Sequence, residues 1–109
     1  MLNKLKGYRV ERKIRIEMEN NGWKVVRAGA SLGEADLICI KSKKCILLQI
    51  KSTRKRKFYY YDYLKKTLQG FPFYLVVDFG YGNIRTLHPK KVVSKNDGQA
   101  FDEFIKHLE

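Results

Sequence analysis

The sequence lacks a long apolar run, is poor in cysteine, and has only 11 acidic residues against 23 basic ones. No stretch reaches the roughly 20 apolar residues that a membrane-spanning helix needs, and we find no basic-then-apolar leader, so a membrane or secreted protein is not expected. Cys39 and Cys45 form no CxxC pair and have no nearby histidine, which argues against a zinc site and for buried free thiols. Repeats and linkers are also absent.

Length and composition indicate one globular domain with a strongly positive surface. A chain of 109 residues can form one core but not two. Its 44% hydrophobic and 13% aromatic content is typical of a folded protein. The formal charge of +12 attracts polyanions, and lysine and arginine neutralise phosphates on contact. We therefore expect a cytoplasmic, nucleoid-associated protein that binds DNA and no membrane, although an anionic membrane surface would also attract this charge.

Three segments have the spacing of helices. In residues 6–21, Val10, Ile14 and Met18 recur every four residues, while the charged side chains fall elsewhere. Residues 58–69 fit a helix closed by a glycine, and residues 99–108 place apolar side chains at steps of three and four. The pattern predicts helices at the start, middle and end of the chain.

Five segments are typical of strands because they are apolar or alternate polar and apolar side chains. They are residues 23–28, 37–40, 45–50, 73–79 and 84–87. The second and third are joined by a short turn into a hairpin, and both are apolar on both faces, which places them centrally. The sequence therefore predicts an α/β fold in which a mixed five-stranded sheet is flanked by helices.

The hairpin carries the residues that are best suited to catalysis. Asp36 lies at its start, and Gln49 and Lys51 lie near its end on one face, because side chains alternate along a strand. Phosphodiester cleavage needs a divalent ion, an activated water and a cation near the developing negative charge. Mg²⁺ prefers oxygen ligands, which Asp36 and the amide of Gln49 supply, and Lys51 can meet the phosphate or the attacking water.

Two further groups are candidate ligands. The carbonyl of Ile50 lies between Gln49 and Lys51, and Glu11 lies at the edge of the apolar stripe of the first helix. On spacing alone, Glu11 fits equally well an ion pair with Arg15 on the helix surface. Asp36 alone would be an ordinary strand-entry residue, but a lysine inside an apolar strand is costly to bury without a carboxylate or phosphate partner.

This pattern resembles the PD-(D/E)xK nuclease superfamily and, within it, the archaeal Holliday junction resolvases of cellular and viral origin. The corresponding features are Glu11 on an N-terminal helix, a Gly-Ala-Ser-Leu-Gly loop, Asp36, an apolar hairpin and the step from Gln49 to Lys51 and Ser52. The resemblance covers residues 7–89. It implies a restriction-endonuclease-like fold and a homodimer that grips a four-way DNA junction and nicks opposed strands with Mg²⁺, for which Mn²⁺ can substitute.

The resemblance also implies roles for single residues. Glu11 and Asp36 become metal ligands, Lys51 the activating cation, and Ser31 a residue near the scissile phosphate. Gln49 departs from the pattern, because the family has glutamate there. The amide keeps an oxygen but removes a negative charge, which weakens Mg²⁺ binding.

Two interpretations of this departure follow. Either Glu34 or Glu11 makes up the missing charge and the protein cuts DNA, or the protein binds DNA without cutting it. A related nuclease with another DNA substrate is a third alternative.

Basic side chains beside this site are expected to contact the DNA backbone. They are Arg9, Arg12, Arg27, Arg54, Lys55, Arg56 and Lys57. The tyrosines at 59, 60, 61 and 63 are suited to stacking on exposed bases or to a protein interface. His88 and His107 have no ligand-like companions and are expected to be structural.

Overall fold

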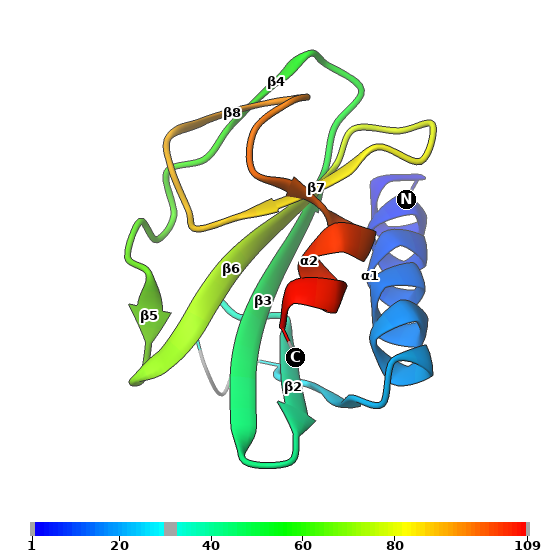
Figure 1. Cartoon of the computed structure of the whole chain (residues 1–109). Helices are drawn as coiled ribbons and strands as arrows, with labels where there is room; N and C mark the ends of the chain where they lie inside the picture. The colour runs from blue at the N-terminus through cyan, green and yellow to red at the C-terminus, as the bar shows by residue number, and fades with distance from the viewer. Residues whose placement is uncertain (1, 30–32, 109) are drawn as a thin grey trace.

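Two helices lie on the same face of a mixed β-sheet in the computed structural model, which describes residues 2–29 and 33–108, with side chains from residue 7 onward (Figure 1). Helix α1 spans Leu2–Asn20 and helix α2 spans Phe101–His107. The predicted stripe of Val10, Ile14 and Met18 is buried against the sheet, because an apolar stripe at this spacing must be covered. Apolar side chains of α2 join the same core.

The main sheet has six strands in one path and a seventh at its side. The path runs β1 (Lys24–Arg27), β2 (Leu37–Lys41), β3 (Lys44–Ser52), β6 (Phe71–Asp78), β7 (Ile84–Leu87) and β9 (Gln99–Ala100). Strand β5 (Thr67–Leu68) pairs with β6, and β4 (Lys57–Tyr59) forms a separate pair with β8 (Val92–Ser94). Strands β3 and β6 are parallel, and the other pairs are antiparallel.

All five predicted strands are present, and β2 and β3 are interior strands as predicted. The predicted count of five was too low for the sheet, because β5 and β9 add two short strands to it. The closing helix begins later than predicted, since Gln99 and Ala100 pair with β7 before α2 starts.

The predicted helix over residues 58–69 is wrong. This segment contains β4, an irregular stretch and β5. Phe58 and Tyr60 pack inward while Tyr59 and Tyr61 are exposed, which is the two-residue period of extended chain. The glycine taken as a helix end instead forms, with Gln69, a two-residue hairpin turn between β5 and β6 in which both φ angles are positive, 54° and 82°.

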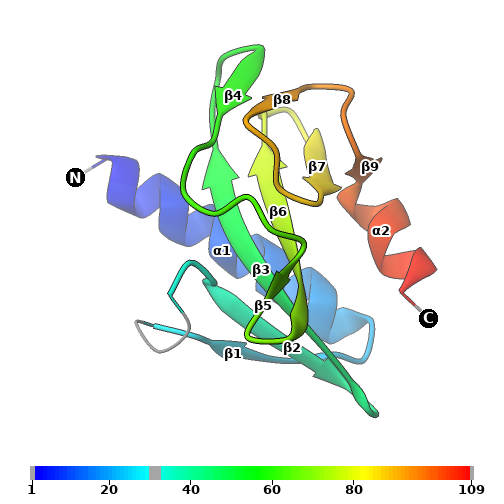
Figure 2. The same ribbon diagram turned by 90° about the vertical axis from the view of Figure 1, so that its left-hand side faces the viewer.

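The segment between β4 and β5 covers the sheet face that α1 leaves open (Figure 2). On that face Tyr60 packs with Leu75, Val77 and Val93, and a neighbouring cluster forms around Phe73. The parallel strands β3 and β6 are thus joined by a non-helical crossover, residues 53–70, that closes the second core. We call residues 53–70 the crossover.

The remaining residues singled out in the sequence have ordinary structural surroundings. Cys39 is buried and Cys45 only partly buried, and both are free thiols. His88 contacts the carbonyl of Phe73 and stacks on Tyr74, in line with a structural role. In the part of the chain that the structure describes, no helix has the length and apolarity to cross a bilayer.

Candidate active site

Asp36 is held at the start of β2 by the neighbouring strand. Its carboxylate Oδ2 accepts a hydrogen bond of 2.7 Å from the backbone N–H of Ile50, and its own N–H donates to the carbonyl of Leu48 at 2.8 Å. Asp36 and Ile50 line a cavity of about 380 Å³ together with Tyr8, Glu11 and Arg27. The hairpin, the end of β1 and the second and third turns of α1 therefore build one concave site around this carboxylate.

Glu11 reaches this cavity but is already paired. Its carboxylate lies 3.0 Å from Nε of Arg27, and its side chain is only 14% exposed. The partner is therefore Arg27 on β1, and not Arg15 one helical turn away. Because the Arg27 side chain keeps 59% of its surface exposed, a DNA phosphate can approach it.

Gln49 and Lys51 lie on the sheet face opposite α1. Both follow Leu47 at two-residue steps, and Leu47 packs in the core on that face. The Gln49 side chain is buried, and its amide oxygen accepts a hydrogen bond from the hydroxyl of Tyr60 in the crossover. The ammonium of Lys51 lies 3.7 Å from the carboxylate of Asp62, two residues after that tyrosine.

Charged groups near the end of the hairpin influence the pKa values of Asp36 and Tyr60. Burial raises the pKa of Asp36, while the bond from Ile50 and the charges of Lys51 and Arg27 act in the opposite direction. Burial also raises the pKa of Tyr60, helped by the charges of Asp62, Glu34 and Asp36. The predicted carboxylate and ammonium therefore lie within electrostatic reach of each other, and Glu34 belongs to the same neighbourhood.

The oxygen atoms present fit a divalent ion only in part. Asp36 and Ile50 share a cavity, and Mg²⁺ commonly binds through one or two carboxylates while the substrate phosphate and waters complete the shell. The oxygen of Gln49 is instead taken by Tyr60, and Glu11 is held by Arg27. Within residues 2–29 and 33–108, no three His, Cys, Asp or Glu side chains converge as a metal-binding group.

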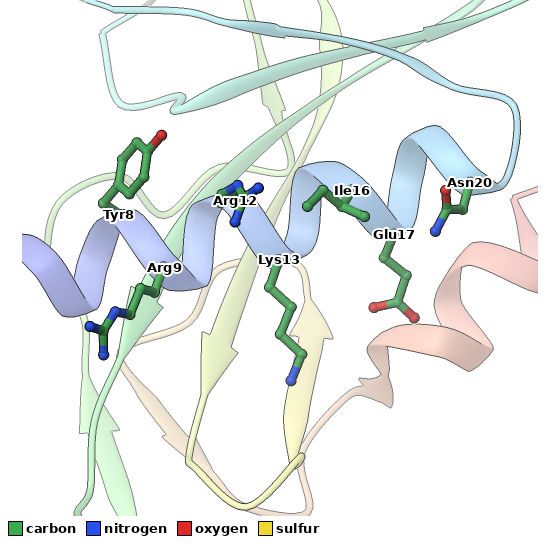
Figure 3. Close-up of a pocket in the computed structure, with 7 residues that line it drawn as sticks. All are labelled: Tyr8, Arg9, Arg12, Lys13, Ile16, Glu17 and Asn20. Carbon is green, nitrogen blue, oxygen red and sulfur yellow. The ribbon is translucent and has the colours of Figure 1, made fainter.

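Apart from Arg27 at the Asp36 cavity, the predicted DNA contacts are distributed over two surfaces. Arg9 and Arg12 lie on the exposed side of α1, beside a groove of about 660 Å³ that also includes Tyr8, Lys13 and Ile16 (Figure 3). The second surface is the beginning of the crossover, where four consecutive basic side chains are exposed: Arg54, Lys55, Arg56 and Lys57. The role predicted for Ser31 falls outside the described residues.

The sequence interpretation missed Tyr60 and Asp62 as neighbours of the site. A helix over residues 58–69 would have given these two side chains no defined place beside Gln49 and Lys51. The available signal was the glutamine itself, because a polar side chain inside an apolar strand needs a hydrogen-bond partner. Of the four tyrosines considered for base stacking, only Tyr59 and Tyr61 are exposed, at 57% and 66%.

Comparisons with known proteins identify the family of the chain and a solved structure with a similar fold. A family model described as archaeal Holliday junction resolvase (Hjc) matches residues 2–98. Among solved structures, the chain is similar to that of Archaeoglobus fulgidus Hjc, a Holliday junction resolvase from an archaeal hyperthermophile. The TM-score is 0.70 at 15% sequence identity, with 93% of this chain and 96% of that chain covered. No curated protein sequence matches.

Proposed function

The chain belongs to the archaeal Holliday junction resolvase family, and on that premise we propose that it is a nuclease that resolves four-way DNA junctions by metal-dependent phosphodiester hydrolysis as a homodimer. The observation that carries the proposal is the position of Asp36 and Lys51. A carboxylate fixed by the neighbouring strand lies within electrostatic reach of an ammonium, at the end of one hairpin. Hydrolysis of a phosphodiester needs a carboxylate that can hold a metal ion and a cation that can meet the phosphate, and here their charges interact across the end of the hairpin.

Each of these side chains has a distinct task. Lys51, whose side chain is 35% exposed, can donate to a phosphate oxygen and stabilise the negative charge that develops during attack. The hydrogen bond from Ile50 orients Asp36, so the carboxylate needs little rearrangement when substrate arrives. Arg27 holds Glu11 at the rim of the same cavity and adds a positive charge there.

Mg²⁺, or Mn²⁺ in its place, is the proposed cofactor. Asp36 and the carbonyl of Ile50 are the groups that would hold it, with Glu11 as a second carboxylate once Arg27 moves to a phosphate. The ion would polarise the scissile phosphate and lower the pKa of an attacking water. The raised pKa of Asp36 means that this carboxyl loses its proton at a higher pH than an ordinary aspartate.

A homodimer follows from the substrate that we propose. Resolution of a four-way junction requires cuts in two opposed strands, and the described residues of one chain supply a single pair of Asp36 and Lys51. Two chains related by a twofold axis would present two such sites to the two equivalent strands. Size-exclusion chromatography with light scattering should therefore give about twice the monomer mass. A cytoplasmic location is part of the proposal, because this is where such DNA is processed.

The groove on α1 is the surface that we assign to the DNA backbone near the cut. Tyr8 lines both this groove and the Asp36 cavity, so the two are adjacent. Arg9, Arg12 and Lys13 provide three positive charges along it, against one negative charge from Glu17 (Figure 3). A phosphate backbone complements that balance.

The direct test uses an end-labelled four-way junction, incubated with protein and Mg²⁺ or Mn²⁺. We expect paired, symmetry-related nicks that disappear when Lys51 is replaced by alanine. Linear duplex of the same sequence, at the same salt concentration, is the control for junction selectivity. Cutting of the duplex at an equal rate would contradict the resolvase assignment and favour a nuclease with another substrate.

One observation favours a second candidate function, a protein that binds junctions without cutting them. The oxygen of Gln49 is taken by Tyr60, so the position that carries a glutamate in the resembling nucleases contributes no charge and no open oxygen here. In the same assay, junction binding without product would support this candidate. Activity that first appears in Gln49→Glu would support it further.

A further inference from the structure

The amide oxygen of Gln49 accepts a hydrogen bond from a structural partner in the core. Gln49 is 5% exposed on the central strand β3, and Tyr60, which donates to it, is 2% exposed. Buried polar groups without partners are costly, so this bond is part of the folded core. Burial and the nearby charge of Asp62 raise the pKa of Tyr60, which keeps its hydroxyl protonated and therefore able to donate.

Tyr60 also anchors the crossover through its backbone and its ring. Its backbone N–H donates to the carbonyl of Lys91 at 2.8 Å, and its ring packs with Leu75, Val77 and Val93. Asp62 follows two residues later and is half-exposed. The place of Asp62 beside Lys51 is thus set by an anchored residue close to it in the chain.

The ion pair itself is too weak to hold the crossover. The side chains of Lys51 and Asp62 are 35% and 50% exposed, and the separation is 3.7 Å. Exposed pairs of this kind contribute little, because water screens them and two flexible side chains must be ordered. The order on which the ion pair depends therefore comes from Tyr60, whose buried bond to Gln49 acts together with its ring packing and its backbone bond to Lys91.

We propose that Gln49 is a positioning residue and not a metal ligand: through Tyr60 it fixes the crossover so that Asp62 orients the Lys51 ammonium. The proposal deepens the proposed function, on which its catalytic part rests. It also explains why an uncharged amide suits this position. A carboxylate at 49 would be buried next to the tyrosine hydroxyl, where Asp62, Glu34 and Asp36 already exert negative charge.

The first test removes only the hydroxyl, in Tyr60→Phe, with Tyr61→Phe as the matched control because Tyr61 is adjacent and 66% exposed. Trypsin cleavage after Lys65 and Lys66, followed by mass spectrometry, reports opening of the crossover without reference to nuclease activity. Loss of one buried hydrogen bond should accelerate it about fivefold in Tyr60→Phe, and Tyr61→Phe should match the parent. Equal rates in all three proteins would overturn the proposal.

The second test measures Mn²⁺ binding by titration calorimetry in the absence of DNA. A positioning role predicts equal affinity in the parent protein and in Tyr60→Phe. If Gln49 were a ligand, removal of the hydroxyl would free its oxygen and tighten binding, which would overturn the proposal. Both measurements remain valid if the parent protein cuts no junction, a result that would count against the proposed function alone.

The third test addresses Lys51 through Asp62→Asn, with Glu19→Gln as an exposed control on α1. Misorientation of the ammonium should lower kcat about tenfold in Asp62→Asn and in Tyr60→Phe, with the junction Kd unchanged. The double variant should be no slower than the slower single variant, because both changes act through one contact. Additive losses, or a raised Kd with unchanged kcat, would contradict the positioning role.

Discussion

The backbone N–H of Ile50 donates a hydrogen bond of 2.7 Å to the carboxylate of Asp36. The bond joins the start of β2 to the end of β3, and a second bond from the Asp36 N–H to Leu48 holds the same pair of strands in register. A carboxylate oriented by the backbone does not depend on flexible side chains for its position. The carboxylate that we propose as a metal ligand is therefore preorganised by the hairpin itself.

Asp36→Asn should stabilise the protein at neutral pH while abolishing cleavage. Burial raises the pKa of Asp36 in the folded state, so ionisation opposes folding once the pH exceeds the unfolded value of about 3.9. Asparagine removes this penalty and still accepts the bond from Ile50. Thermal denaturation should give a higher Tm for the variant at pH 7.5, with the difference vanishing below pH 4.

Asp97→Asn is the control, because its Tm should change in the opposite direction. The bond from the Ser94 N–H, and then Lys90, lower the pKa of Asp97, so its ionised form stabilises the fold above the unfolded pKa. That contribution is lost as the pH falls through the folded pKa. This variant should have a lower Tm at pH 7.5. An unchanged or lower Tm in Asp36→Asn would show that the pKa of Asp36 is not raised.

Lys51→Met should remove cleavage and leave junction binding nearly intact. Methionine preserves most of the apolar stem but takes away the charge that we assign to the phosphate oxygens. Loss of one such stabilising donor lowers kcat by about 100-fold or more. Single-turnover cleavage and a gel-shift titration separate the two effects, with Lys24→Met, an exposed lysine on β1, as the control. A comparable loss in the control would refute a specific role for Lys51.

Arg9→Ala and Arg12→Ala should weaken binding by removing phosphate contacts along the α1 groove. Each lost contact should reduce the slope of log Kd against log salt concentration by about 0.9. Fluorescence anisotropy at several KCl concentrations measures the slope. Lys43→Ala, at the tip of the β2–β3 hairpin, has the same charge change away from the groove. An unchanged slope in both arginine variants would place the DNA elsewhere.

Gly98→Ala should destabilise the fold far more than Gly82→Ala. Both glycines have positive φ, 64° and 78°, so both substitutions carry a backbone cost of about 1 kcal/mol. Only at Gly98 would the new Cβ lie 2.3 Å from the carbonyl oxygen of Thr86, on the strand that pairs with β9. Urea denaturation should show at least about 2 kcal/mol of additional loss for Gly98→Ala. Equal losses would mean that the chain relaxes around the methyl group.

The sequence was informative where the pattern of side chains reflects burial. The four-residue spacing of Val10, Ile14 and Met18 places α1, and the apolar runs place β2 and β3 at the centre of the sheet. The hairpin between those strands brings Asp36 near Lys51, since the register follows from a short turn. The catalytic roles of these residues remain predictions.

The crossover was not predictable in the same way. The spacing of its tyrosines is compatible with a helix or with extended chain. Extended chain forms because Phe58 and Tyr60 pack against the sheet face that α1 leaves open. The partner of Gln49 is 11 residues away in sequence and is reached only after the chain has folded over this face. Likewise, no local pattern pairs Glu11 with Arg27, because the contact joins a helix to an edge strand.

The absence of a helix between β3 and β6 has an evolutionary consequence. The pairing of strands in the sheet is held by backbone hydrogen bonds, whereas the crossover is held by a few side chains such as Tyr60. New sequences can therefore be tried in this connection, including its basic run, while the scaffold stays intact. A lineage that shifted from one DNA shape to another would be expected to diverge here first, and chimeras exchanged at Thr53 and Gly70 offer a way to transfer such preferences.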